Sequence, residues 1–305
     1  MHLLKLAFAF LLIGAAPAEV PVGAFQTWLS SKKVPLDFTS GGVTVHVEAL
    51  PCPAQPIGDT TCHWEGYNNQ AAVTVRAPGV TPVTVITDGQ SAYARIAVVR
   101  FDKGDPRPGL IVESQSGGSG GDLTAQLIVP SDNSYLALAL GGHDMPHLQG
   151  QIGDFPRDLN GDGHIDLKLE DGAFDSAFGC NACTPRPPIL FAVKGAKIVD
   201  ESRDPALRSV FGTDMARLAP RCLTETRYRN GACAAYVADA ARAGNFKAAW
   251  GAMLEHYERG VDVWQPCGLG DTEEKNDGSA KPIICFHDFP ESLRAFLNRA
   301  GYLPS

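Results

Sequence analysis

Positive charge and long apolar runs are both scarce in this sequence of 305 residues. Beyond residue 18, no segment is apolar over the length that a membrane-spanning helix needs, so we expect no transmembrane segment in the mature chain. Removing the leader takes Lys5 from the 26 basic residues and leaves 25 against 34 acidic ones, a net charge of −9. Such a surface repels phosphate backbones and anionic membranes and suits divalent cations. Nucleic acid is therefore excluded, and a protein or polysaccharide is the expected class of partner.

Residues 1–18 have the pattern of a secretory signal peptide. His2 and Lys5 precede an apolar run, and small residues follow up to Ala18, after which we expect cleavage. No cysteine stands at that position to accept a lipid. The mature protein is therefore expected to be periplasmic or secreted.

All eight cysteines lie in the mature part, and an even number in an oxidising compartment predicts disulfides. Many connectivities are compatible with the sequence alone. Proximity favours four short loops: Cys52 with Cys62, Cys180 with Cys183, Cys222 with Cys233, and Cys267 with Cys285.

Residues 19–203 are predicted to form a β-rich domain of antiparallel sheets. Short β-branched runs alternate with clusters of Gly, Pro and Asp, a pattern typical of all-β domains. Both a sandwich and a partial propeller fit this pattern. The expected strands are 43–50, 72–77, 81–87, 93–101, 109–114, 123–130, 135–141, 164–170 and 187–193.

Residues 204–305 are predicted to form a small α-helical domain stapled by the last four cysteines. Apolar residues recur at three and four spacing, with Asp, Asn or Pro at the starts and Gly at the ends. The expected helices are 204–219, 232–244, 245–260 and 289–301. The middle pair resembles a tetratricopeptide-type hairpin, but an ordinary helical hairpin is the preferred interpretation, because repeat arrays need about three units.

The stretch DLNGDGHID, residues 158–166, predicts a metal site. Oxygen-bearing side chains recur around this tight loop at Asp158, Asn160, Asp162 and Asp166. Gly163 stands at the turn and His164 in the seventh position. Calcium prefers oxygen ligands from alternate side chains together with one backbone carbonyl, here that of His164. Asp171, Asp154 and Asp175 are candidates for a further ligand and cannot be ranked from the sequence.

The loop is not expected to belong to an EF-hand. Gly150, Gly153 and Pro156 preclude an entering helix. On the exit side, Leu167 and Leu169 alternate with polar residues, which is the period of a half-buried strand. Leu169 also stands where an EF-hand places a bidentate glutamate.

Residues 154–193 resemble the calcium-binding β-hairpin repeats of the FG-GAP (integrin-like, VCBS-type) family, on the strength of the DxNxDGxxD motif at 158–166. The resemblance implies a structural ion. It also implies side-chain ligation by Asp158, Asn160, Asp162 and Asp166 and carbonyl ligation by His164. Only one such loop is present, and the β-rich region is too short for a complete seven-bladed propeller.

Three other patterns suggest chemistry but have simpler structural interpretations. Ser119 lies in a GxSxG sequence, but an expected strand follows it where a nucleophile elbow needs a helix. His143 and His147 flank Pro146, which disfavours a helical zinc site. Cys180 and Cys183 precede a proline-rich stretch, which favours a structural disulfide over a thioredoxin-type motif.

The sequence therefore predicts a calcium-binding structural or interaction module of the cell envelope. The alternative is a secreted hydrolase with a cleft between the two domains, lined by His143, Asp144 and His147. No set of catalytic residues converges in the sequence, so the catalytic residues and the question of enzymatic activity stay open.

Overall fold

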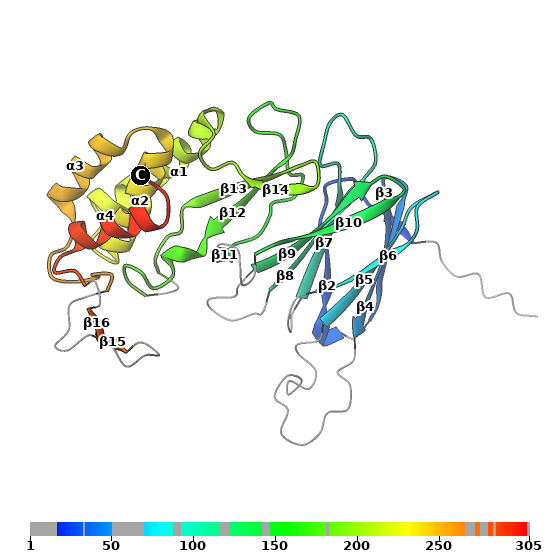
Figure 1. Ribbon diagram of the computed structural model, residues 1–305, viewed down its shortest axis with the longest axis horizontal. Coiled ribbons are helices and arrows are strands. Elements are labelled where there is room, and N and C mark those ends of the chain that lie inside the picture. Colours follow the sequence, from blue (N-terminus) through cyan, green and yellow to red (C-terminus); the bar gives the residue numbers. More distant parts are fainter. Residues whose placement is uncertain are drawn as a thin grey trace, which may run out of the picture.

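The computed structural model describes residues 17–32, 34–50, 70–87, 93–115, 123–141, 147–180, 183–265, 272–274, 280–282 and 285–303. Sheets occupy the N-terminal part and helices the C-terminal part, as predicted (Figure 1). Residues 1–16 of the expected signal peptide lie outside the described residues. Ala18, after which cleavage is expected, pairs with Phe38 in the first sheet.

Three sheets follow one another along the chain, except that β2 precedes most of the first sheet and joins the second. The first has the order β1-β3-β4-β5-β6, with strands Ala18–Glu19, Leu36–Ser40, Val43–Leu50, Gln70–Arg76 and Val83–Ile86. The second has the order β10-β9-β8-β7-β2, with strands Ser134–Leu140, Leu123–Ser131, Gly109–Gln115, Tyr93–Val99 and Gln26–Leu29. The third has the order β11-β12-β13-β14, with strands Leu148–Gln149, Asp166–Asp171, Pro188–Lys194 and Lys197–Asp200. A short hairpin, β15 (Thr272–Glu274) and β16 (Ala280–Pro282), stands apart.

The second sheet is buried on both faces. Val98 and Leu110 pack against the first sheet, whereas Val99 and Ile111 pack against the third. This explains why β8 is buried along almost its whole length, while β4 alternates buried and more exposed residues. The sheets therefore stack face to face, with the helices beyond the third sheet (Figure 1).

The stacking bears on whether the β-rich region is a sandwich or a partial propeller. The first and second sheets enclose a shared apolar core, as in a sandwich. Each sheet also contains four consecutive antiparallel strands, β3 to β6, β7 to β10 and β11 to β14. A four-stranded meander is the unit from which propeller blades are made. The predicted antiparallel β-rich region is confirmed, and it is a stack of three such meanders.

The helical part surrounds one buried helix. The helices are α1 (Arg208–Leu223), α2 (Arg229–Ala243), α3 (Phe246–His256) and α4 (Phe289–Arg299), and a 3-10 turn, η3 (Pro205–Leu207), precedes α1. Nearly all of α2 is buried, because α1, α3 and α4 pack around it. The predicted helical hairpin is thus part of a compact helical unit.

The predicted helix limits need several corrections, and the third helix ends at His256 rather than at residue 260. The first helix continues past residue 219 to Leu223 with Pro220 inside it, because its C-terminal turn is joined to α2 by the Cys222–Cys233 disulfide. The second helix begins earlier than residue 232, at Arg229, where the Asn230 side chain bonds the backbone of Glu258 and Val261. Tertiary contacts therefore override the weak local sequence signals at the end of α1 and at the start of α2.

The disulfides agree with the predicted short loops where they can be compared. Cys180 is bonded to Cys183, and Cys222 to Cys233. Cys285 is also disulfide-bonded. Cys52, Cys62 and Cys267 lie outside the described residues.

The core of the helical part includes residues from before residue 204. Phe174, the last residue of the 3-10 turn η2 (Gly172–Phe174), and Phe178 both pack edge-to-face on Phe296, with ring centroids 4.9 and 5.1 Å from its ring. The Tyr302 hydroxyl donates to Asp171 Oδ2 at 2.8 Å. The third sheet and the helices are therefore joined by shared packing rather than by a linker alone.

A buried ion pair attaches the segment before the loop 158–166 to the second sheet. Arg95 on β7 donates to Glu113 on β8 at 2.6 Å, and Glu113 also accepts from the Ile152 amide at 2.5 Å. Burial raises the pKa of Glu113 to about 7, although Arg95 and the Ile152 amide act in the opposite direction. The carboxyl group therefore keeps its proton in the folded protein to a higher pH than in the unfolded chain.

Glu113 should make stability depend on pH. The contribution of Glu113 to the free energy of unfolding is fully present below pH 4.5, falls as the pH rises towards about 7, and is constant above that. It falls in this window because the carboxyl group ionises more easily in the unfolded chain than in the folded protein. One pKa unit corresponds to about 1.4 kcal/mol, so the change is roughly 3 kcal/mol. Urea unfolding at several pH values should show a shallower slope for Glu113→Gln. The exposed Glu48→Gln should keep the wild-type slope, and an unchanged slope in Glu113→Gln would contradict the assignment.

Candidate metal site

The loop 158–166 is closed by a short antiparallel bridge rather than by helices. The amide of Asp166, the first residue of β12, donates to the Arg157 carbonyl at 2.9 Å. Gly163 and Gly161 have φ values of 96° and 82°, a region that favours glycine. The far edge of the loop is held by the Lys103 amide, which donates to the Gly163 carbonyl at 2.8 Å. The loop therefore leads into a strand and no helix flanks it, as predicted.

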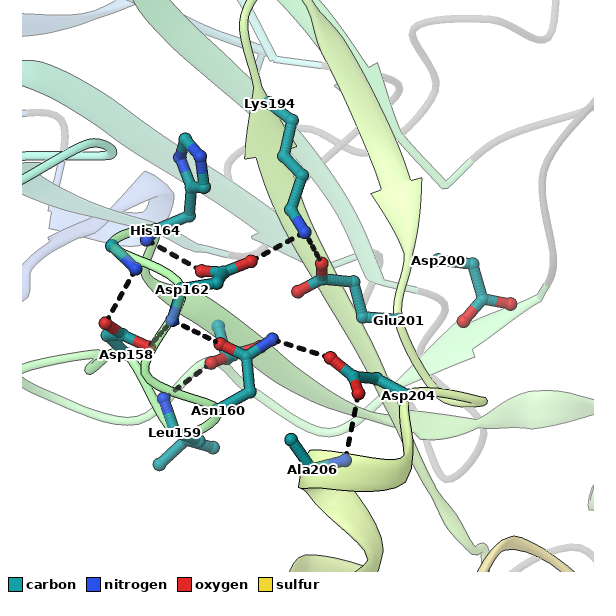
Figure 2. Close-up of polar contacts among 12 residues, drawn as sticks. Asp158, Leu159, Asn160, Asp162, His164, Lys194, Asp200, Glu201, Asp204 and Ala206 are labelled. Carbon is teal, nitrogen blue, oxygen red and sulfur yellow. Dashed lines mark hydrogen bonds and ion pairs between the residues drawn. The ribbon is translucent and has the colours of Figure 1, made fainter.

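Carboxylates and amides organise the inside of the loop (Figure 2). Asp158 accepts from the amides of Gly161 at 2.6 Å and Gly163 at 2.9 Å. Asn160 Oδ1 accepts from the Asp162 amide, and Asp162 Oδ1 from the His164 amide. Each side chain thus turns inward to bond the backbone two or more residues ahead, as short Asx turns do.

The other two predicted residues stand at the end of the loop. Asp166 Oδ2 accepts from the Leu159 amide at 2.6 Å, which ties the end of the loop to its beginning. The His164 side chain lies on the opposite side from Asp162, with Nδ1 4.0 Å from the Asp102 carboxylate. His164 could therefore contribute only its carbonyl to a site inside the loop.

The third sheet adds charged groups from the hairpin β13–β14. Asp166 is paired with Ala192 in register, and Glu201 follows β14 with its amide bonded to the Leu190 carbonyl. Side chains two residues apart on a strand share a face, so Asp166, Lys194 and Glu201 meet on one side of the sheet. The small side chain of Ala192 leaves space among them.

Lys194 reaches between the loop and Glu201 (Figure 2). Its Nζ lies 2.6 Å from Asp162 Oδ2 and in direct contact with Glu201 Oε1. These two carboxylates raise the pKa of Lys194 well above its usual range. Partial burial raises the pKa of Asp162, but the bonds from Lys194 and the His164 amide outweigh it and leave that pKa lowered.

Asp166 and Glu201 form the most buried part of the cluster, at 3% and 6% exposed. One oxygen of each, Asp166 Oδ1 and Glu201 Oε2, is buried without a hydrogen-bond donor. Burial first, and then the adjacent Glu201 carboxyl, raises the pKa of Asp166 to about 6. Two such oxygens repel each other unless a proton or a cation lies between them.

None of the further ligands suggested by the sequence reaches the loop. Asp171 is bonded to the Ala173 amide and the Tyr302 hydroxyl, and Asp154 to the Phe25 amide. Asp175 is paired with Arg186. The acidic groups that do adjoin the loop are Glu201 and Asp204. The Asp204 Oδ2 atom accepts a hydrogen bond from the Asn160 amide group at 3.0 Å. The only signal of Glu201 and Asp204 in the sequence is that they are acidic and follow a strand.

The donors fit calcium in kind, since they are carboxylate and amide oxygens from alternating positions. In the described part of the chain, however, no three His, Cys, Asp or Glu side chains are already gathered as a metal-binding group. Asp162 and Glu201 are turned to Lys194, and Asp158 to backbone amides. In this structure, the carboxylates of Asp162 and Glu201 are therefore arranged around the Lys194 ammonium group.

The other patterns are only partly within the described residues. Ser119, His143 and Asp144 lie outside them, but β8 and β9 flank the Ser119 stretch and pair antiparallel, so a strand follows it as predicted. His147 Nδ1 lies 3.1 Å from the Gly172 carbonyl and 3.8 Å from Asp175. Cys180 and Cys183 are joined, and the described residues after Cys183 lead into β13 without a helix, as predicted.

The family model covers only the helical part, whereas two relatives match longer stretches of the chain. Residues 211–301, from within α1 to just beyond α4, match the family model described as the sll0997 C-terminal domain. A relative from Synechocystis sp., described as the probable thylakoid lumen protein sll0997, is 27% identical over 215 residues, 69% of this chain. The uncharacterized protein y4bJ of Sinorhizobium fredii is 24% identical over 297 residues, 93% of this chain. No solved structure matches.

The chain spans 61% of the length of the Synechocystis relative and 43% of that of the Sinorhizobium relative. In the part of the chain that the structure describes, no helix combines the length and the apolar character needed to cross a membrane. The loop 158–166 lies outside the region matched by the family model.

The Asp158 side chain should hold the loop together even without an ion. Asp158→Ala removes the acceptor for the amides of Gly161 and Gly163, at a cost of about 1 kcal/mol because the loop is solvent-exposed. Amide hydrogen exchange should accelerate at these two glycines. Asp105→Ala, which breaks a comparable turn at the Arg107 amide, should leave them unchanged. If the amides of Gly161 and Gly163 exchange as slowly in Asp158→Ala as in the wild type, the Asp158 side chain does not organise the loop.

Proposed function

We propose that this protein is an extracytoplasmic calcium-binding module in which the ion is structural and braces the loop 158–166 against the third sheet. The observation that carries the proposal is the pair of buried carboxylate oxygens, Asp166 Oδ1 and Glu201 Oε2, that have no donor. A divalent cation would supply the missing positive charge to both.

The available oxygens match the needs of calcium, which takes about six to eight oxygen ligands. Asp158, Asn160, Asp162 and Asp166, with the carbonyl of His164, are the ligands implied by the FG-GAP resemblance. Glu201 adds a carboxylate from the neighbouring strand end, which could bind through one or both oxygens.

The brace would connect three parts of the chain. Asn160 in the loop donates to Asp204, and Asp204 in turn caps η3 through the Ala206 amide at 2.9 Å. Since η3 leads directly into α1, an ion in the loop would stabilise the contact between the β-rich part and the helices. An open coordination position facing a substrate is not required for this role.

Two observations favour a location outside the cytoplasm. The disulfides Cys180–Cys183 and Cys222–Cys233 are typical of an oxidising compartment. One relative is described as a probable thylakoid lumen protein, which is also extracytoplasmic. The leader-like residues 1–18 are consistent with the same route.

An interaction role is supported by the surface beside the loop. A hollow of about 650 Å³ is lined by residues that include Phe155, Leu159 and Asp166. Phe155 and Leu159 are 53% and 40% exposed, which is unusual for large apolar side chains lying close together. A protein or polysaccharide partner could contact this surface, whose shape an ion in the loop would stabilise.

Removal of calcium should destabilise the protein. Thermal unfolding of the mature protein is expected to shift down by several degrees in EDTA and to recover with calcium, because binding to the folded state alone stabilises it. Asp162→Ala should abolish this response. Asp200→Ala is the matched control, since Asp200 is adjacent to Glu201 in sequence but points away from the loop (Figure 2). A wild-type protein indifferent to both EDTA and calcium would refute the proposal.

A further inference from the structure

The Lys194 ammonium occupies the place where the loop and the third sheet present their oxygens to each other. Its Nζ is 2.6 Å from Asp162 Oδ2 and touches Glu201 Oε1. Two carboxylates of the proposed calcium site are therefore already neutralised in part by a cation from the chain itself.

The same oxygens cannot serve Lys194 and calcium together. An ion that bound Asp162 and Glu201 would bring two positive charges within a few ångströms of the ammonium, and like charges at that distance repel strongly. The lysine can leave, because its charge sits on a flexible four-carbon stem and its side chain is 37% exposed.

The buried oxygens of Asp166 and Glu201 indicate that the site can take a cation other than the Lys194 ammonium group. The lysine satisfies Glu201 Oε1, but Glu201 Oε2 and Asp166 Oδ1 stay buried without a donor. With Asp158, Asp162, Asp166 and Glu201 at the site, one ammonium leaves a surplus of negative charge. A divalent ion would neutralise that surplus more completely.

We infer that Lys194 is a tethered cation that holds the site when calcium is absent and is displaced when calcium binds. This inference rests on the proposed function. Displacement reduces the affinity, so the site responds to calcium at the higher concentrations found outside the cytoplasm, where modules have dissociation constants of about 10⁻⁴ to 10⁻³ M. The lysine also keeps the empty loop folded.

The test is calcium binding by isothermal titration calorimetry to the full mature protein and two variants. Lys194→Met should bind calcium at least tenfold more tightly than the wild type. Lys197→Met is the matched control, because it removes the same charge from the register partner of Lys194 across the β13–β14 turn, and Lys197 forms no ion pair with the described residues. Its affinity should stay close to that of the wild type.

A second measurement uses the unmodified sequence. Calcium should increase the rate at which Lys194 is acetylated by a small reagent, read by mass spectrometry, while Lys197 keeps its rate. Equal or weaker binding by Lys194→Met, or unchanged labelling of Lys194 in a wild type that binds calcium, would overturn the inference. If neither the wild type nor Lys194→Met binds calcium, the proposed function itself fails.

Discussion

The third sheet has to bury apolar side chains on both faces, and the position of the charged site follows from this constraint. Leu167 and Phe191 pack against the second sheet, whereas Leu190 packs against α1. Polar groups are therefore collected beside the start of β12 and the end of β14. There Asp166 and Glu201 are largely removed from water, and buried carboxylates need a compensating charge.

The compensation is incomplete with the groups of the chain alone. Lys194 neutralises Asp162 and one oxygen of Glu201, while the facing oxygens of Asp166 and Glu201 have no donor. Breaking a buried charge network is generally costly because the remaining charges stay unpaired. A cation site here would therefore act on the stability of the loop, the hairpin β13–β14 and the start of the helical part at once.

The fold and the site carry different information about function. The helical part matches a family model, but the model's description states no activity, and the loop lies outside its range. Three stacked meanders resemble propeller blades in connectivity, yet a fold of this kind serves many functions. The argument for cation binding therefore depends on individual oxygens and on what surrounds them.

The sequence by itself determined much of the local structure: nine of the strands, the four helices, and a tight loop whose inward side chains and glycines are specified by neighbours in the chain. The short disulfides were favoured by the sequence but not fixed by it. It could not identify the partners of that loop. Asp154, Asp171 and Asp175 are near it in sequence but bind Phe25, Tyr302 and Arg186, whereas Glu201 and Lys194 reach it from another strand pair. Only the tertiary structure decided this, because strand register and core packing, and not sequence separation, set which charged groups share one face of the third sheet.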